Sequence, residues 1–217
     1  MSVRDVRPRT QNETPAAATV PGGNPALLGL PALLSGGVTL GLWLVGYLDT
    51  ATLPGGMIPA VTVSSGLFLL VACIWGVRVG QGALAGIFGT FSAFWLSFGF
   101  LVLGAINGWF GISTAPSLRT EQLQNVAATF VLSWLIVFAT LTVATLRLPL
   151  AYTSGFAVVC TTLALVLGFV VNGNELFATL GGITTFVFCA IYAYIFVDAM
   201  TQELGGNAMP MGDPIQQ

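Results

Sequence analysis

The chain has 217 residues, of which 55% are hydrophobic and only 6% are charged. Soluble domains usually carry about 25% charged residues, so the composition argues against a water-soluble enzyme. The formal net charge is −2 and every basic residue is an arginine, which argues against a nucleic-acid-binding protein because that class presents a basic face. The chain contains no histidine, the commonest general base and metal ligand. We therefore expect no enzymatic activity, no metal site and no cofactor.

The first element is a polar arm over residues 1–22, rich in Pro, Ala and Thr. It lacks the apolar core that follows the basic part of a signal peptide. Segments of this composition cannot bury enough apolar surface to fold alone. We predict a disordered arm on the cytoplasmic side of a membrane.

Six uncharged stretches follow, each of 21 to 24 residues. Each exceeds the roughly 18 residues that argue for a transmembrane helix, and none shows the alternation of a barrel strand. They cover residues 27–48, 57–77, 83–106, 123–146, 150–171 and 176–197. The sequence predicts an all-α membrane protein in which residues 23–200 form a bundle of six transmembrane helices. Residues 201–217 would be a cytoplasmic tail, with about the last ten disordered.

The placement of arginine predicts the orientation. Six spans bring both termini to one side of the membrane, together with the second and fourth loops. The other side holds only Arg119. Cytoplasmic loops carry the excess of basic residues, so both termini are predicted to be cytoplasmic. The arginines of that side are Arg4, Arg7, Arg9, Arg78 and Arg147.

The spans contain cysteines, glycines and hydroxyls but no charged residue at their centres. Cys73, Cys160 and Cys189 stand singly and are expected to be small buried residues. Small pairs such as Gly37 and Gly41 permit close helix packing, although small residues also leave room for a substrate path. The hydroxyls of the spans, which include those of Thr162, Thr184 and Thr185 among many others, are expected mostly to bond the backbone of their own helix or a neighbouring helix.

The third span has an aromatic stripe. Phe88, Phe91, Trp95 and Phe98 recur at helical spacing and share one face. Such a stripe is most often packing or lipid contact, but it also suits a hydrophobic constriction that gates a pore. The two interpretations remain open at this point.

A motif stands at the beginning of the first span, where residues 24–30 read Asn-Pro-Ala-Leu-Leu-Gly-Leu. Asn24 is a good N-cap, and Pro25 suits the first helical turn. The free N–H groups of a helix start attract anions. The alternative is a capped helix without a ligand.

This motif closely resembles the Asn-Pro-Ala-Pro-Leu-Gly-Leu signature of the acetate uptake transporter family, which includes the succinate–acetate permeases. The third span resembles the family's Ser-Tyr-Gly-x-Phe-Trp segment, and the C-terminal end resembles its acidic exit from the sixth helix. The matching residues of the first motif are Asn24, Pro25, Ala26, Leu28, Gly29 and Leu30. Those of the third-helix motif are Thr90, Phe91, Ser92, Phe94 and Trp95.

The resemblance implies a homohexamer of six-helix protomers in the plasma membrane. Each would take up acetate and related small carboxylates, with succinate a further candidate, by a proton-linked or channel-like mechanism. It also implies a constriction that includes Leu33, where the family often has Phe, and Phe91, where it often has Tyr. The fifth-helix member is not assigned, and residues 158–159 are only a guess.

Two features bear on the substrate. The family's second Pro is Leu27 here, and the hydroxyl of the family's Tyr is absent from Phe91. No fixed cation lies within the spans, so a carboxylate is expected to pass more easily with a proton, as its pKa is roughly 4. Two alternatives remain, a channel for small neutral solutes such as urea or short amides and a non-transporting membrane scaffold.

Overall fold

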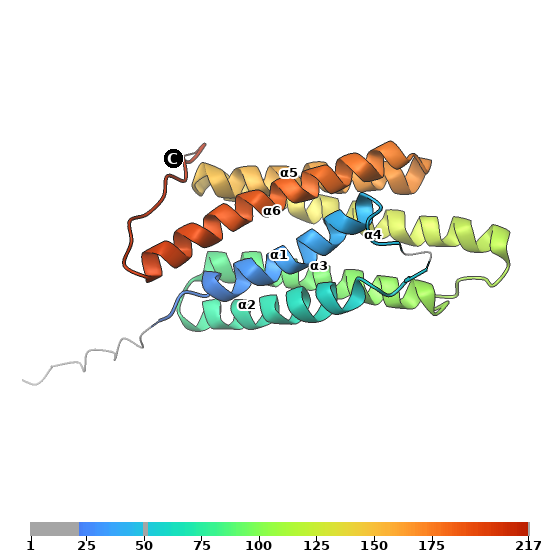
Figure 1. The fold of residues 1–217 in the computed structure, drawn as a ribbon, viewed down its shortest axis with the longest axis horizontal. Helices are drawn as coiled ribbons and strands as arrows, with labels where there is room; N and C mark the ends of the chain where they lie inside the picture. Colours follow the sequence, from blue (N-terminus) through green and yellow to red (C-terminus); the bar gives the residue numbers. More distant parts are fainter. Residues whose placement is uncertain (1–21, 50–51, 217) are drawn as a thin grey trace, which may run out of the picture.

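The computed structural model describes residues 22–49 and 52–216, and every regular element within these ranges is a helix. The predicted arm over 1–22 lies outside these ranges except for its last residue. Figure 1 shows the long helices side by side, with the start of the first and the end of the last at the same end of the molecule. The elements are α1 (Ala26–Leu44), η1 (Pro59–Leu67), α2 (Phe68–Arg78), α3 (Gly82–Ile106), α4 (Pro116–Ala144), η2 (Thr145–Arg147), α5 (Leu150–Asn172) and α6 (Glu175–Glu203).

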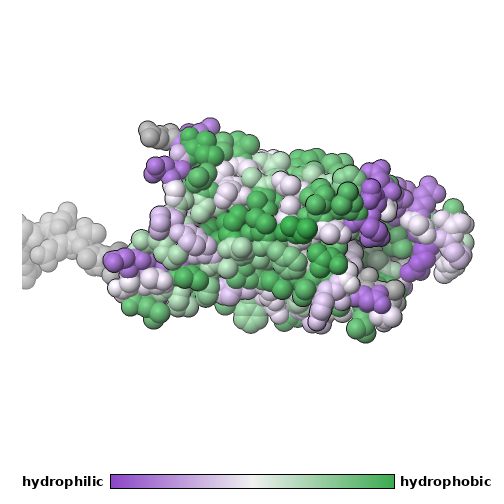
Figure 2. All heavy atoms as spheres, turned by 45° about the horizontal axis from the view of Figure 1, so that its top comes forward, coloured by the Kyte–Doolittle hydropathy of each residue, from purple (hydrophilic) through white to green (hydrophobic). Residues whose placement is uncertain are grey.

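Six of the described helical stretches are long and apolar enough to cross a membrane, with η1 and α2 counted as one. Figure 2 shows apolar side chains over the middle of the molecule and hydrophilic ones gathered at its two ends. Both observations confirm the predicted fold class, a bundle of six transmembrane helices. The cytoplasmic position of the termini stays a prediction.

Two observed helices extend beyond the predicted spans by more than one residue, whereas α1 ends at Leu44, before the predicted limit at residue 48. Helix α4 begins at Pro116, before the predicted beginning at residue 123, and so includes the charged residues Arg119 and Glu121. Proline fits the first turn of a helix, and a charged turn can continue a helix beyond the hydrocarbon. Helix α6 likewise continues to Glu203.

The second span contains a feature that was not predicted. Its first half, η1, is a π-helix that begins with Pro59. Within it, Ser65 donates a hydrogen bond to the carbonyl oxygen of Ala32 at 2.5 Å, and the hydroxyl of Ser92 donates to that of Gly66 at 2.8 Å. A hydrophobic stretch of uniform composition does not distinguish π from α turns, so the sequence carried no signal for it.

Helix α1 packs closely through its glycines. A Cβ atom on Gly29 would lie 2.4 Å from the ring of Phe88, so this glycine lets α3 approach α1. A Cβ atom on Gly41 would lie 2.9 Å from the ring of Phe186 on α6. In contrast, Gly86 on α3 has no neighbour within 4 Å of such an atom.

The C-terminal tail after α6 folds back onto the helices. The carboxylate of Asp198 accepts a hydrogen bond from the backbone N–H of Met209 at 2.6 Å. Tyr194 donates its hydroxyl to the carbonyl oxygen of Pro210 at 2.7 Å, and the N–H of Gln216 donates to Leu146. The expectation that the last ten residues are disordered is therefore wrong for the described part of the tail.

Candidate functional site

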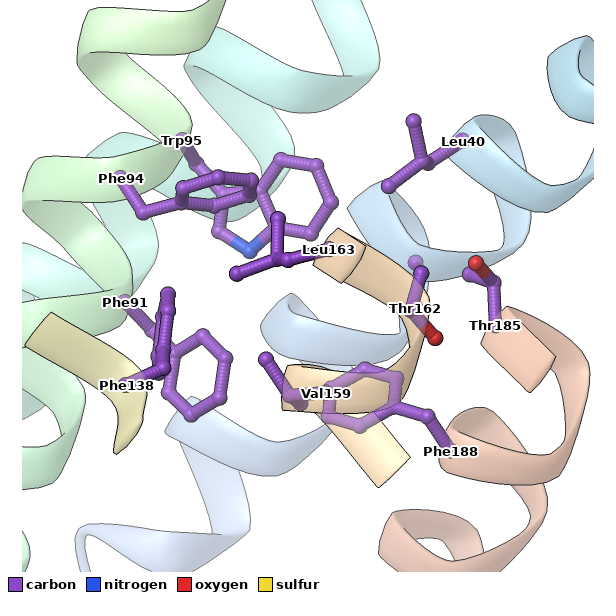
Figure 3. A pocket seen from close by; sticks show the side chains of 11 residues that line it. Leu40, Phe91, Phe94, Trp95, Phe138, Val159, Thr162, Leu163, Thr185 and Phe188 are labelled. Carbon is purple, nitrogen blue, oxygen red and sulfur yellow. The ribbon is translucent and has the colours of Figure 1, made fainter. Parts of the chain in front are cut away.

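A narrow apolar cavity lies at the middle of the bundle, between α1, α3, α4, α5 and α6. Its volume is about 30 Å³, room for a water molecule or two and not for a hydrated carboxylate. Figure 3 shows Phe94 and Trp95 on one side of it and Thr162 and Thr185 on the opposite side. The lining residues are Gly37, Leu40, Phe91, Phe94, Trp95, Phe138, Val159, Thr162, Leu163, Thr185 and Phe188.

Phe91 contacts aromatic side chains of other helices on several sides of the cavity. Its ring centroid lies 4.9 Å from that of Phe138, 5.9 Å from that of Phe188 and 6.2 Å from that of Tyr192. The ring is 2% exposed. Helices α3, α4 and α6 therefore meet at a layer of aromatic rings, and any solute that passes the cavity has to displace some of them.

The polar atoms around the cavity are few. The hydroxyl of Thr162 donates to that of Thr184 at 2.8 Å, and the hydroxyl of Thr185 donates to the carbonyl oxygen of Gly181 at 2.7 Å. Both oxygens keep the capacity to accept a hydrogen bond. The indole Nε1 of Trp95 is buried and has no hydrogen-bond partner. None of the lining side chains carries a charge.

A recess opens at each end of the same group of helices. One, of about 460 Å³, lies where α1 begins and α6 ends, and its lining includes Asn24, Asp198 and Glu203. The other, of about 390 Å³, lies where α1 ends and α6 begins, and its lining includes Asp49 and Glu175. Each recess thus has two acidic side chains, and neither lining includes a basic residue.

The cavity lies between the two recesses along the helix axes. On α1 the lining residues progress from Ala26 in the first recess, through Gly37 and Leu40 in the cavity, to Trp43 in the second. Helices α5 and α6 also line all three spaces. From the first recess through the cavity to the second, α5 contributes Tyr152, Val159 and Phe169 in turn. The three hollows therefore follow one line across the bundle, with the apolar cavity as its narrowest part.

Comparison with known proteins places the chain in a family. Residues 9–205 match the sequence model of the GPR1/FUN34/yaaH family. The chain belongs to this family. That match confirms the resemblance to the acetate uptake transporters noted in the sequence. No curated relative matches the chain.

A solved structure shares the fold of this family member. It is described as the structure of the bacterial acetate channel SatP, and it is 19% identical over 88% of this chain and 99% of its own, with a TM-score of 0.73. At 19% identity, this structural similarity shows that the two proteins share a fold. It supports the assignment of this family member as a multi-pass membrane protein.

The first family motif lies at the edge of the recess where α1 begins. Asn24 accepts a hydrogen bond from the N–H of Ala26 at 3.0 Å, as expected for a capping residue. Pro25, Gly29 and Leu30 are buried, and Leu28 is partly buried. Asn24 and Ala26 line the recess, whereas the apolar members of the motif serve the packing of α1.

The two residues expected at the constriction lie on different helices, and only one of them lines the cavity. Phe91 does so, whereas Leu33 is fully buried on α1, one turn before Gly37. The guess at residues 158–159 includes one lining residue, Val159.

The third-helix motif divides between two faces of α3. Phe94 and Trp95 line the cavity. Ser92 is buried against η1. Thr90 lies in an outer groove beside Cys73 and Trp134, and its hydroxyl donates to the carbonyl oxygen of Gly86 on its own helix.

Several lining residues were not singled out from the sequence. Phe138 and Phe188 belong to α4 and α6, which carry many apolar residues in every direction, so no period marks the inward face. Leu163 is indistinguishable in the sequence from the other leucines of its span. Thr162 and Thr185 were noted only as two of many hydroxyls.

Proposed function

We propose that this protein conducts acetate and related small monocarboxylates across the plasma membrane, along the line of the two recesses and the central cavity. The observation that carries the proposal is the apolar cavity at mid-bundle, aligned with a recess at each end, in a member of this family. A bacterial acetate channel has the same fold. The protein acts as a transporter or channel in this proposal, and not as an enzyme.

Passage is proton-linked in this proposal. Removing a bare carboxylate from water is costly without a partner charge, and no lining side chain of the cavity is charged. Glu175 in one recess and Glu203 in the other repel an anion and do not repel the neutral acid. The acid therefore crosses the cavity more easily with its proton attached.

The proposed orientation places both termini in the cytoplasm, and the proposed assembly is a homohexamer. The orientation rests on the excess of arginine on the side of the termini. The assembly rests on the family resemblance, and the outer faces of α2 and α4 are apolar enough to meet other copies or lipid. Exposed residues on these faces include Val71, Ile74, Leu132 and Ile136.

One assay tests the proposal. The purified protein is placed in liposomes, and the uptake of labelled acetate is compared with that of labelled succinate, urea and acetamide. We expect saturable acetate uptake that unlabelled acetate inhibits and urea does not. Transport of urea or acetamide in preference to acetate would establish a channel for neutral solutes instead. Failure to move any of the four would favour a non-transporting scaffold.

A further inference from the structure

Two buried hydrogen-bond donors in the described part of the protein have no partner. They are the indole Nε1 of Trp95 on α3 and the hydroxyl of Tyr192 on α6. Trp95 is 2% exposed and Tyr192 is 1% exposed. Buried polar groups are almost always hydrogen-bonded, and leaving one without a partner destabilises the fold. Two unpartnered donors in the same region of a small bundle are therefore unusual, and a ligand that binds them would explain both.

The Trp95 nitrogen borders the central cavity. Figure 3 shows it on the edge of the indole that faces Leu163, within the space that the lining residues enclose. An indole N–H donates and cannot accept. Since Thr162 and Thr185 already donate their protons elsewhere, Trp95 is the one side chain of the lining with a donor to offer.

The Tyr192 hydroxyl lies on the other side of the Phe91 ring. A Cβ atom on Gly155 would lie 3.2 Å from this hydroxyl oxygen, which places the oxygen beside the first turns of α5. Val159, one turn further along α5, lines the cavity, and Tyr152, about one turn earlier, lines the recess beside Asp198. The hydroxyl therefore lies between that recess and the cavity.

We propose that Tyr192 and Trp95 donate hydrogen bonds in succession to the carboxyl oxygen of the acid as it passes Phe91. This proposal rests on the proposed transport of carboxylic acids and names the groups that bind them. The two donors lie on opposite sides of the narrowest part of the path. Each donor replaces one of the hydrogen bonds to water that the acid loses there.

The arrangement suits the neutral acid in particular. A carboxylic acid has a carbonyl oxygen that accepts and a hydroxyl that donates. Beside Trp95 the carbonyl oxygen accepts the indole proton, and the acid hydroxyl faces threonine oxygens that can only accept. A carboxylate anion, which only accepts, leaves those oxygens unused and brings a charge that nothing in the lining neutralises.

The test compares Trp95→Phe and Tyr192→Phe with matched controls in liposomes. Both substitutions keep a ring and remove the donor. Trp109→Phe and Tyr47→Phe remove the same groups from exposed positions, where the side chains are 42% and 80% exposed. We expect each donor variant to raise the half-saturating acetate concentration by roughly two- to tenfold, the value of one neutral hydrogen bond. The controls should behave as the wild type.

Thermal stability separates binding from structure. A donor that has no partner in the folded protein contributes nothing to the fold, so Tyr192→Phe, which keeps the size of the ring, should melt at or above the wild-type temperature. Trp95→Phe also removes buried ring atoms and should melt somewhat lower, so for this variant the half-saturating concentration is the deciding measurement. Lower melting temperatures with unchanged half-saturation would overturn the proposal and assign the two side chains to packing. If wild-type liposomes move no acid at all, the proposed function fails, and this outcome is distinct from transport that is indifferent to the two donors.

A measurement on the wild type keeps the test decisive if a variant does not fold. The chain has five tryptophans, and the indole N–H resonance of Trp95 can be assigned by elimination with variants of the other four. Titration with acetate at low pH should shift this resonance more than the others. An unchanged Trp95 resonance at saturating acetate would contradict the proposal.

Discussion

Gly37 of α1 and Cys189 of α6 are in such close contact that a Cβ atom on Gly37 would lie 2.7 Å from the cysteine sulfur. The ring of Phe188, which lines the cavity, would be 3.2 Å from the same atom. This close approach fixes the distance between two helices that border the cavity. It also explains the role of a small-residue pair that the sequence alone left open.

Gly37→Ala should therefore destabilise the bundle. The added methyl group forces α1 away from α6 or displaces the Phe188 ring, at a cost of about 1–3 kcal/mol. Gly86→Ala is the matched control, because Gly86 is also helical and faces open space. Thermal melting in detergent, followed by circular dichroism, should show a lower midpoint for Gly37→Ala alone. Equal midpoints for the two variants would contradict the packing described here.

Phe91→Leu should widen the path. The substitution removes the ring that contacts Phe138, Phe188 and Tyr192 and keeps an apolar side chain. Acetate flux should rise severalfold, and a larger acid such as succinate should pass more readily relative to acetate. Phe100→Leu, at an exposed position on the same helix, should leave both fluxes unchanged. A flux that does not respond to Phe91→Leu would exclude this ring from the path.

Acetate uptake should increase as the external pH falls. With a carboxyl pKa of roughly 4, the neutral fraction of the acid grows about tenfold for each pH unit between about pH 7 and pH 5. Initial rates at constant total acetate, measured over this range in liposomes and corrected for protein-free vesicles, test the effect. Rates proportional to the acetate anion would contradict passage of the neutral acid.

Asp198→Ala should release the C-terminal tail. The carboxylate accepts hydrogen bonds from Met209 at 2.6 Å and from the side chain of Gln202 at 2.7 Å, and bonds to a charged acceptor contribute about 1.5–3 kcal/mol each. Amide hydrogen exchange over residues 204–216 should accelerate. Glu203→Ala, at an exposed position, serves as the control and should leave the exchange slow.

Cysteine labelling should establish the orientation. In intact cells, an impermeant maleimide should react with Glu121→Cys and reach Asp213→Cys only after permeabilisation. The wild-type protein gives the background, since its three cysteines lie within the spans and are at most partly exposed. The reverse pattern would place both termini outside.

The sequence predicted the spans well because hydrophobic length and charge placement are local properties. The expected stretch over 83–106 differs from α3 by one residue, and that over 150–171 differs from α5 by one. The predicted beginning of α4, at residue 123, was wrong. The charges of Arg119 and Glu121 end the uncharged stretch, but the helix continues through them and starts at Pro116.

The site was harder to predict because its residues come together only through packing. The aromatic stripe of the third span included Phe91 and Trp95, yet only the contact partners on other helices distinguish cavity from core. Phe88, from the same stripe, fills the notch at Gly29. The lack of a partner for the Trp95 nitrogen depends on all of its neighbours at once, so no local pattern reveals it.

The hydrogen bonds that Thr162 and Thr185 donate also determine whether protons can leak through the protein. A chain of hydroxyls and waters that can pass protons from one to the next would discharge the membrane potential. In the cavity both threonine hydroxyls are held by acceptors within the protein, and the remaining lining is hydrocarbon apart from the indole. We therefore expect the protein to be impermeable to protons when no weak acid is present, so that a cell can express it without losing its gradient.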